Sequence, residues 1–385
     1  MSGLKRPPHR RNLREIETLE AFVEHGGDLR EVAVQGLDLT AAAVDWDRID
    51  VCSTLFLGCR FPSDRVQASL QRRGALVFPR FADRPYDPYR KSLYTPAELT
   101  ESCEWGGVRQ SRDRHIHGWY VSAGRHLPDV GEALAQRLHD FAIDDALGDL
   151  IGESTEARLS RRIVGIMGGH AKRRDSEAYA RAARVGWLLG RDHLVVTGGG
   201  PGIMEAGNLG AYLSDRSEAA LETALDLLRR APSPDDPGSR RAAEEVQAAF
   251  PGGRMSLAVP TWFYGFEPIN LFGARIAKYF SNSIREDGLL AICLHGIVFA
   301  EGSAGTVQEV FMDAAQNHYG TFDHRSPMAF LGRQRYEPSS GVGVYPTLVA
   351  EARDYAHLLM LSDSPEEVAA FIRESAPAPG AGERR

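Results

Sequence analysis

Cysteine is scarce in this chain, and its pattern excludes the sites that cysteines usually build. The four cysteines, Cys52, Cys59, Cys103 and Cys293, form no C-x-x-C pair, so neither a zinc site nor a disulfide framework is indicated. No run of eighteen apolar residues occurs, and the first residues, M-S-G-L-K-R-P-P-H-R-R, lack an apolar signal core. We therefore expect a cytoplasmic protein with no metal centre and no membrane partner.

An excess of charge is also missing. The 45 lysines and arginines and the 52 aspartates and glutamates leave a net charge of −7, which gives no general support for nucleic-acid binding. Hydrophobic residues make up 43% and charged residues 25% of the chain, an ordinary composition for a soluble protein. With 385 residues, the chain is long enough for one large domain or two ordinary ones.

Three common cofactor motifs are absent as well. The segment G-G-G-P-G at 198–202 does not have the G-x-G-x-x-G spacing of dinucleotide-binding proteins. Neither this turn nor the one at 302–305 is followed by the Lys-Ser or Lys-Thr of a P-loop, and neither supplies a lysine for pyridoxal phosphate. The sequence therefore predicts no cofactor and disfavours a dinucleotide enzyme, a P-loop NTPase and a lysine decarboxylase.

What the chain does contain, between residues 297 and 316, is a strand, a glycine turn and a helix in succession. The run Ile297–Ala300 is apolar and predicts a buried strand, which G-S-A-G at 302–305 follows. From Thr306 onward, apolar side chains recur at helical spacing, so a helix begins where the glycines end. This geometry binds phosphate through the free N–H groups and the dipole of the helix.

Glu309 falls in the first turn of that helix, near enough to the glycine turn to act on a ligand held there. A structural interpretation exists as well, because Thr306 and Glu309 have the spacing of a capping box. In a capping box the two side chains only satisfy N–H groups at the start of the helix. Taken alone, this stretch leaves both interpretations open.

The same pattern recurs upstream. An apolar strand, Leu194–Val196, runs into G-G-G-P-G, and Glu205 follows about one turn into the next helix. A third strand, in the segment 163–170, also ends in glycines. Tight packing of strand against helix would select glycines too, and is the alternative to phosphate binding. We expect the turns at 198–202 and 302–306 at the C-terminal ends of neighbouring parallel strands, sharing one phosphate.

The two glycine motifs together resemble those of the Lonely Guy (LOG) phosphoribohydrolases, formerly misannotated as lysine decarboxylases. The resemblance rests on G-G-G-P-G-I-M-E-A at 198–206 and G-S-A-G-T-V-Q-E at 302–309, and it covers about Ile163–Asp363. It implies a Rossmann-like fold, a homodimer or higher homo-oligomer, and hydrolysis of a nucleoside 5′-monophosphate to free base and ribose 5-phosphate. The second motif departs from the family at Glu301, where proline is usual, which puts a negative charge beside the loop.

The resemblance also implies roles for single residues. Glu309 would be the catalytic carboxylate, and Arg285 would hold the nucleotide and assist the leaving group, with Arg275 and Lys278 as weaker candidates. An arginine early in a helix is otherwise a surface residue, which is the alternative for Arg285. Glu205 would bind ribose hydroxyls or support its loop. The substrate-binding residues would be Gly168, Gly169, Gly198, Gly199, Gly200, Gly202, Met204, Glu205, Gly302, Ser303, Gly305 and Thr306.

Aromatic residues gather just past a predicted strand at 256–260. Ligands of open parallel sheets bind beyond the C-terminal ends of the strands, so these aromatic rings could stack on a planar base. Two helices are expected next, and the second begins at Ser283, because Ser283-x-x-Glu286 is another capping-box pattern. The aromatic residues are Trp262, Phe263, Tyr264 and Phe266.

A pair of histidines, His115 and His117, precedes this region and could bind a metal on one face of a strand. No third ligand with suitable spacing lies near the pair. We therefore favour a surface or hydrogen-bonded pair over a metal site.

We predict an α/β protein in which helices flank a Rossmann-like parallel sheet, with a smaller β-containing N-terminal domain. The helical stretch between the two parts shows apolar spacing but no catalytic motif. The expected segments are a mobile basic N-terminus at 1–14, a small α+β domain at 15–125, a helical linker at 126–160, the Rossmann-like domain at 161–375 and a flexible tail at 376–385.

The sequence thus predicts an N-glycosidase that acts on nucleoside 5′-monophosphates. The alternative is a nucleotide-binding regulatory protein with little or no hydrolysis, and Glu301 in place of the motif proline is the residue that supports it. The sequence does not choose the base, because every nucleoside monophosphate presents the same phosphate and ribose.

Overall fold

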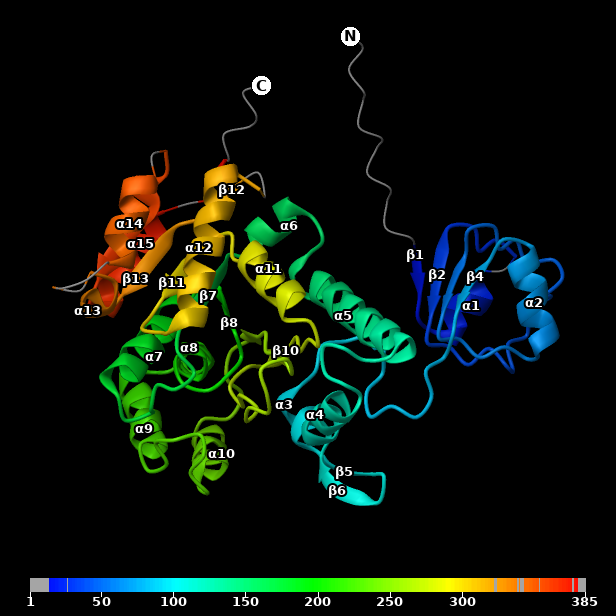
Figure 1. Cartoon of the computed structure of the whole chain (residues 1–385), viewed down its shortest axis with the longest axis horizontal. Helices are drawn as coiled ribbons and strands as arrows, with labels where there is room; N and C mark the ends of the chain where they lie inside the picture. Colours follow the sequence, from blue (N-terminus) through cyan, green and yellow to red (C-terminus); the bar gives the residue numbers. More distant parts are fainter. Residues whose placement is uncertain are drawn as a thin grey trace, which may run out of the picture. The chain divides into compact units, whose positions relative to one another are not determined.

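The computed structural model describes residues 14–25, 27–321, 324–337, 339, 343–352, 354–375 and 377–379. The chain divides into two compact units (Figure 1). Unit 1 comprises Met1–Lys91 with Val130–Ala142, and unit 2 comprises Ser92–Asp129 with Ile143–Arg385. Residues 92–125, which the sequence analysis assigns to the N-terminal domain, are part of unit 2, as are residues 126–129 of the predicted linker. Of the predicted mobile N-terminus at 1–14, residues 1–13 lie outside the described residues, and Arg14 begins strand β1.

Unit 1 is built on a four-stranded parallel sheet whose strands follow one another in chain order. Apolar side chains such as Phe22, Val34, Phe56 and Leu70 form its core. Because all four strands are parallel, their carboxyl ends lie along one edge of the sheet. The elements are β1 (Arg14–Ile16), α1 (Leu19–Glu24), β2 (Val32–Gln35), β3 (Leu55–Leu57), α2 (Asp64–Arg72) and β4 (Leu76–Phe78).

Unit 2 contains a seven-stranded sheet in the order β10-β9-β8-β7-β11-β13-β14. Every pair of neighbouring strands is parallel, and β7 lies at the centre. The strands are β7 (Ile163–Met167), β8 (Leu194–Thr197), β9 (Leu257–Ala258), β10 (Arg275–Ile276), β11 (Ile297–Phe299), β13 (Met328–Leu331) and β14 (Leu359–Ser362). The predicted class, an α/β protein with a parallel sheet flanked by helices, is confirmed.

Helices cover both faces of this sheet, which explains why its central strands are mostly apolar. On one face, α7 packs closely on α8. Gly210 permits this approach, because a Cβ there would overlap the backbone of Ala183. Val164 and Ile166 of β7 contribute to the core on this face, whereas Gly165 points the other way, toward Cys293 after α11. In Figure 1, α11 and α12 lie side by side. The helices are α7 (Glu177–Leu189), α8 (Ile203–Tyr212), α9 (Glu218–Leu228), α10 (Ser239–Ala249), α11 (Asn282–Ile292), α12 (Ala304–Tyr319), α13 (Arg333–Tyr336), α14 (Val344–Glu351) and α15 (Pro365–Glu374).

The histidine pair lies on a helix, so the expectation of a strand was wrong. His115 is buried on α4, where its Nε2 donates to the Cys103 carbonyl at 2.9 Å and its Nδ1 accepts from Gln110 at 3.0 Å. These contacts confirm the hydrogen-bonded interpretation for His115. The elements between residues 96 and 160 are α3 (Pro96–Thr100), β5 (Ser102–Trp105), β6 (Val108–Ser111), α4 (Arg112–Ser122), α5 (Val130–Ile151) and α6 (Thr155–Ser160).

Both predicted capping boxes are wrong, because each helix begins before the expected capping residue. α12 begins at Ala304 with Ser303 as its N-cap, so Thr306 is already the third helical residue. α11 begins at Asn282, which places Ser283 inside the helix. The interpretation of Glu309 as half of a cap therefore fails on geometry.

A helix predicted before α11 does not form. Residues 271–281 instead carry the edge strand β10, in which the Ile276 amide donates to the Tyr94 carbonyl at 2.8 Å. Tertiary pairing thus overrides the local apolar pattern. In the predicted tail, β15 (Ala378–Pro379) pairs with β12 (His324–Arg325). Earlier in the chain, a short 3-10 turn, Ala356–Leu358, precedes β14.

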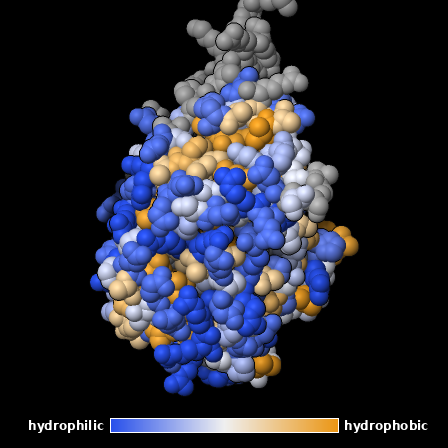
Figure 2. All heavy atoms as spheres, turned by 90° about the vertical axis from the view of Figure 1, so that its left-hand side faces the viewer, coloured by the Kyte–Doolittle hydropathy of each residue, from blue (hydrophilic) through white to orange (hydrophobic). Residues whose placement is uncertain are grey.

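No helix in the described ranges is long and apolar enough to span a bilayer. Figure 2 shows the face of unit 2 that carries α7, α9 and α14, where hydrophilic residues dominate and hydrophobic ones occur in small groups.

Candidate functional site

Three glycine turns follow β7, β8 and β11 at the carboxyl edge of the large sheet. Gly168, Gly198 and Gly302 come within three residues of the ends of their strands. β7 lies between the other two strands. The prediction that the turns after β8 and β11 lie on neighbouring strands is therefore wrong. All three turns nevertheless lie at the edge where ligands of parallel sheets bind.

Close packing explains most of these glycines. A Cβ at Gly168 would overlap Ile203, one at Gly198 would overlap the Arg285 guanidinium, and one at Gly302 would overlap Thr306. Gly199 and Gly202 have φ values of 75° and 69°, a conformation that side chains disfavour. The packing alternative therefore accounts for these positions.

Gly305 is different. A Cβ there would meet nothing within 4 Å. It faces a cavity of about 500 Å³ that the glycine turns enclose with residues of α11, α12 and the aromatic segment. The lining residues are Gly168, Gly169, His170, Gly198, Met204, Thr261, Tyr264, Glu267, Arg285, Glu286, Ser303, Ala304, Gly305, Thr306, Gln308 and Glu309. Of the predicted substrate-binding residues, Gly199, Gly200, Gly202, Glu205 and Gly302 are not among them.

The N-terminus of α12 opens onto this cavity. Ser303 makes no side-chain cap, and no acceptor in the described part of the chain meets the N–H groups of Ala304, Gly305 and Thr306. These donors and the positive end of the helix dipole favour an anion at this place.

Arg285 is buried at the back of the cavity and is not a surface residue. Its Nε donates to the Val259 carbonyl at 2.7 Å and its Nη2 to the Gly198 carbonyl at 3.2 Å. Its Nη1 lies 3.7 Å from Glu309 Oε1 and 3.9 Å from Glu286 Oε1. Two backbone carbonyls thus hold the guanidinium in place and leave one edge directed at the two carboxylates.

The weaker arginine and lysine candidates lie elsewhere. Arg275 is exposed on the edge strand β10, where its side chain donates to the neighbouring Ala274 carbonyl. Lys278 is buried and pairs with Asp113 at 2.7 Å. Neither lines the cavity, so Arg285 is the cation of this site.

Glu309 is the most perturbed acid of the cavity. Its side chain is 12% exposed, and burial raises the pKa of its carboxyl to about 7, with Arg285 lowering the pKa and Glu286 raising it. Burial prevails because the guanidinium is 3.7 Å away and forms no hydrogen bond with the carboxylate. A carboxyl group that exchanges its proton near neutral pH suits acid–base catalysis.

Sequence reasoning missed a second carboxylate and its partners. Glu286 is buried and accepts from Gln308 Nε2 at 2.8 Å and from the Tyr264 hydroxyl at 3.4 Å. Asn282 donates to the same hydroxyl at 2.8 Å. Burial, followed by the charge of Glu286, raises the pKa of Tyr264. The sequence analysis assigned Glu286 only to a capping box. Gln308 could have been noted because it directly precedes Glu309 in the second glycine motif.

Only one of the four aromatic candidates lines the cavity, and that residue is Tyr264, which is 66% exposed. Trp262 is fully buried and donates to Asp113 at 2.8 Å. Phe266 lies under the Arg114 guanidinium at 4.1 Å, and Phe263 packs near His126. Tyr264 is therefore the ring that can contact a planar group in this cavity.

Glu205 and Glu301 are both held in ion pairs. Glu205 is buried and accepts from Arg174 at 2.5 and 2.8 Å and from the Tyr179 hydroxyl at 2.9 Å. It supports the loop at 174 rather than pointing into the cavity. Glu301 pairs with Lys172 at 2.6 Å, so a cation balances the charge that replaces the usual proline.

Comparisons with known proteins give one family match. Residues 161–216 match the model of the SLOG cluster4 family, a stretch that contains β7, α7, β8, α8 and the glycine turn at 198–202. The chain is therefore similar to SLOG proteins in this part of unit 2. No curated protein matches the chain.

Solved structures give weak matches. The molybdenum cofactor binding protein of the phototrophic bacterium Rippkaea orientalis is 12% identical, with a TM-score of 0.35, over 55% of this chain and 96% of its own. Two structures of the molybdenum cofactor carrier protein of Chlamydomonas reinhardtii are 14% and 16% identical, with TM-scores of 0.36 and 0.35. Each covers 56% of this chain, and 97% and 96% of its own. These scores are too low to transfer a ligand to this chain.

Proposed function

We propose that this protein hydrolyses the N-glycosidic bond of a nucleoside 5′-monophosphate, releasing the free base and ribose 5-phosphate. The observation that carries the proposal is the position of Glu309. It is a carboxyl group with a pKa of about 7 that faces an anchored arginine. It also lies in the same cavity as the free N-terminus of α12.

Each part of the substrate has a matching group. The N–H groups of Ala304, Gly305 and Thr306 would bind the phosphate. Tyr264 would lie against the base, and Glu309, five residues beyond the first residue of α12, would reach the ribose. Glu286 adds a second carboxylate at this point.

The chemistry follows from the charge that develops during cleavage. When the bond between C1′ and the base nitrogen breaks, positive charge appears on the ribose, and an ionised Glu309 stabilises it. The oxygen of a water molecule then bonds to C1′, and Glu309 accepts a proton from this water. The departing base takes a proton from the solvent, to which Glu309 afterwards releases the proton it accepted. Arg285 holds Glu309 partly ionised at neutral pH, because its guanidinium lowers the pKa of this carboxyl.

The regulatory alternative loses its main support. It rested on Glu301 in place of the motif proline, and Lys172 balances the negative charge of Glu301 at 2.6 Å. The hydrolase is therefore the proposal that the site supports better.

The test is to incubate purified protein with AMP, GMP and CMP and to follow free base and ribose 5-phosphate by chromatography. The proposal expects equal amounts of both products from at least one substrate. A Glu309→Gln protein purified in parallel controls for contaminating nucleosidases. Saturable nucleotide binding without any product would favour the regulatory protein instead.

A further inference from the structure

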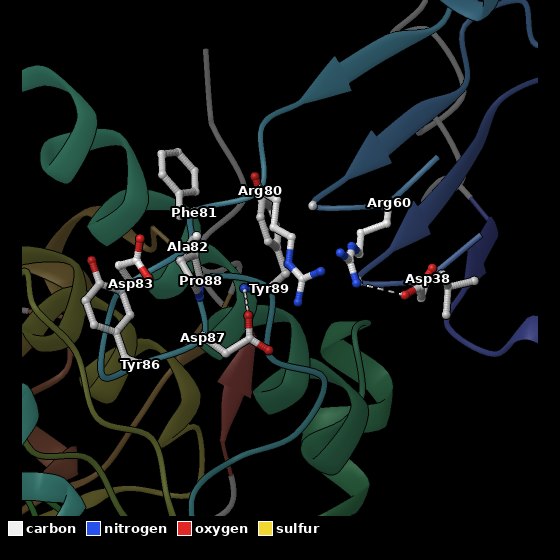
Figure 3. Close-up of a pocket in the computed structure, with 13 residues that line it drawn as sticks. Asp38, Arg60, Arg80, Phe81, Ala82, Asp83, Tyr86, Asp87, Pro88 and Tyr89 are labelled. Carbon is white, nitrogen blue, oxygen red and sulfur yellow. Dashed lines mark hydrogen bonds and ion pairs between the residues drawn. The ribbon is translucent and has the colours of Figure 1, made fainter. Parts of the chain in front are cut away.

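Unit 1 has a cavity of its own, of about 670 Å³, which lies within the range of small-molecule sites. It lies at the carboxyl edge of the small parallel sheet, where Gly36 follows β2, Gly58 follows β3 and Arg80 comes two residues after β4 (Figure 3). This is the edge at which open parallel sheets bind ligands.

A segment that folds back over the ends of the strands forms one wall of the cavity. Gln35 donates its side-chain amide to the carbonyls of Tyr89 and Arg90, each at 3.3 Å, and the Tyr89 hydroxyl donates to the Pro79 carbonyl at 2.8 Å. Gly58 has a φ of 64°, and a Cβ there would overlap the Tyr89 ring. The wall therefore has a defined position.

Two arginines on adjacent strand ends enter this cavity. Arg60 pairs with Asp38 at 3.3 Å, and Asp38 also accepts from the Thr40 hydroxyl at 2.6 Å. Arg80 forms no hydrogen bond or ion pair with any residue in the described ranges. In Figure 3 the guanidinium groups of Arg60 and Arg80 extend toward each other. Like charges placed in this way repel unless an anion lies between them.

The acidic residues of the lining do not fill that place. Asp87 Oδ1 accepts from the Tyr89 amide at 2.9 Å, which uses it within its own loop. Asp83 lies beside Tyr86, on the side of the close-up away from Arg60 (Figure 3). Arg60 is thus paired with Asp38, whereas the Arg80 guanidinium has no carboxylate within ion-pair distance among the described residues.

Two aromatic side chains line the cavity together with the arginines. The rings of Phe81 and Tyr89 stack with centroids 6.3 Å apart and an angle of 26° between their planes, and both residues line the cavity. An aromatic surface next to paired guanidinium groups suits a ligand that has an oxyanion at one end and a planar body at the other.

We propose that unit 1 contains a second binding site, for a small organic oxyanion. Its phosphate or carboxylate would lie between Arg60 and Arg80, and its planar body would lie against Phe81 and Tyr89. Guanidinium forks recognise both oxyanions in a bidentate manner, so the two sources share one chemistry. This site is independent of the hydrolysis proposed for Glu309.

The test is calorimetric titration of the full chain with phenyl phosphate, benzoate and inorganic phosphate. Phenyl phosphate and benzoate carry the planar ring, whereas inorganic phosphate carries only the oxyanion. The proposal expects the ring-bearing probes to bind more tightly than inorganic phosphate. If phenyl phosphate binds more tightly than benzoate, the site prefers a phosphate, and if benzoate binds more tightly, it prefers a carboxylate.

Variants assign the binding to this cavity. Arg80→Gln and Arg60→Gln should each weaken the binding by roughly 10-fold, the effect of losing one charge-assisted contact. Arg72→Gln, an exposed arginine on α2, should leave it unchanged. Probe binding that is unchanged in both Arg80→Gln and Arg60→Gln but lost in Arg285→Ala occurs in the cavity of unit 2. Equal affinities in Arg80→Gln and Arg72→Gln, or no saturable binding of any probe at millimolar concentration, would overturn the proposal.

Discussion

Arg285 Nη1 and Glu309 Oε1 face each other at 3.7 Å, too far apart for a hydrogen bond and close enough for a strong electrostatic effect. The arginine cannot approach further, because its Nε and Nη2 are bound to the carbonyls of Val259 and Gly198. The carboxyl group therefore stays in a buried place where its pKa is about 7. Backbone positions at the ends of β8 and β9 thus set the protonation of a side chain on α12.

The first prediction concerns the charge of Glu309. Glu309→Gln keeps the shape of the side chain and leaves the start of α12 intact, because Ser303, not Thr306, is the N-cap. We expect normal folding, retained nucleotide binding and a fall of about 100- to 1,000-fold in release of free base, as for loss of one well-placed electrostatic group. Thermal unfolding, nucleotide titration and product chromatography measure the three effects.

A matched control is Glu222→Gln, a change of the same kind at an exposed position on α9. It should leave all three measurements unchanged. If Glu309→Gln releases ribose 5-phosphate at nearly the wild-type rate, Glu309 is not the catalytic carboxylate.

The second prediction is a pH profile. Glu309 acts as a carboxylate in the proposed reaction, and its pKa in the folded protein is about 7. The kcat/KM for a nucleoside monophosphate should therefore rise with pH through about 7 and level off above it. The inflection should be missing from the residual activity of Glu309→Gln. A rate that falls through the same range would mean that the protonated form is the active one.

The third prediction separates Arg285 from the other cations of this region. Arg285→Ala removes the charge that lowers the pKa of Glu309, so the inflection of the pH profile should move to higher pH. Nucleotide binding should weaken roughly 10-fold through the lost cationic contact. Arg275→Ala, at an exposed edge-strand position, should change neither value. Equal effects of the two variants would remove Arg285 from the site.

The sequence was sufficient for the central strands of the large sheet and for the cavity's glycine turns because both depend on local pattern. The apolar runs at β7, β8 and β11 are buried on both faces of a parallel sheet, so they contain few polar residues. Glycines after the strands then mark the points where backbone and helix come close. Arg285 could be placed in the cavity only through the family resemblance.

The pairings within the site could not be read from the sequence, because their partners are far apart in the chain. Lys172 and Glu301 are 129 residues apart, and Arg174 and Glu205 are 31 apart. No helical or strand period connects such positions. The start of α12 was also misjudged, since Ala304 and Gly305 extend the helix toward the turn and convert an expected cap into a free N-terminus.

The fourth prediction tests the structural role of Glu205. Removing one partner of a buried ion pair leaves an uncompensated charge, so Glu205→Ala should lower the free energy of unfolding by about 3–5 kcal/mol. The affinity of the folded protein for nucleotide should change little, because Glu205 points at Arg174 and Tyr179. Replacing both Arg174 and Glu205 by methionine should recover most of the loss. A large loss of nucleotide affinity without a loss of stability would instead place Glu205 on the ribose.

The last prediction concerns a buried acid that the proposed reaction does not use. Asp313 lies on α12, its Oδ2 has no hydrogen-bond partner in the described structure, and burial raises its pKa to about 8, with a hydrogen bond from Ser326 acting in the opposite direction. The folded state therefore keeps a proton that the unfolded state releases near pH 4. Because the folded state binds more protons in between, this group makes stability fall as pH rises from about 4 to about 8.

Asp313→Asn removes this titration, so its stability relative to the wild type should increase steadily from pH 5 to pH 8 and change little above that range. The measurement is the difference in Tm between the two proteins at each pH, in which the contribution of Glu309 cancels because both proteins contain it. Asp287→Asn, at an exposed position on α11, should give a difference that does not depend on pH. A constant difference for Asp313→Asn would show that Asp313 is ionised in the folded protein throughout this range, with a counter-charge that the structure does not contain among its described residues.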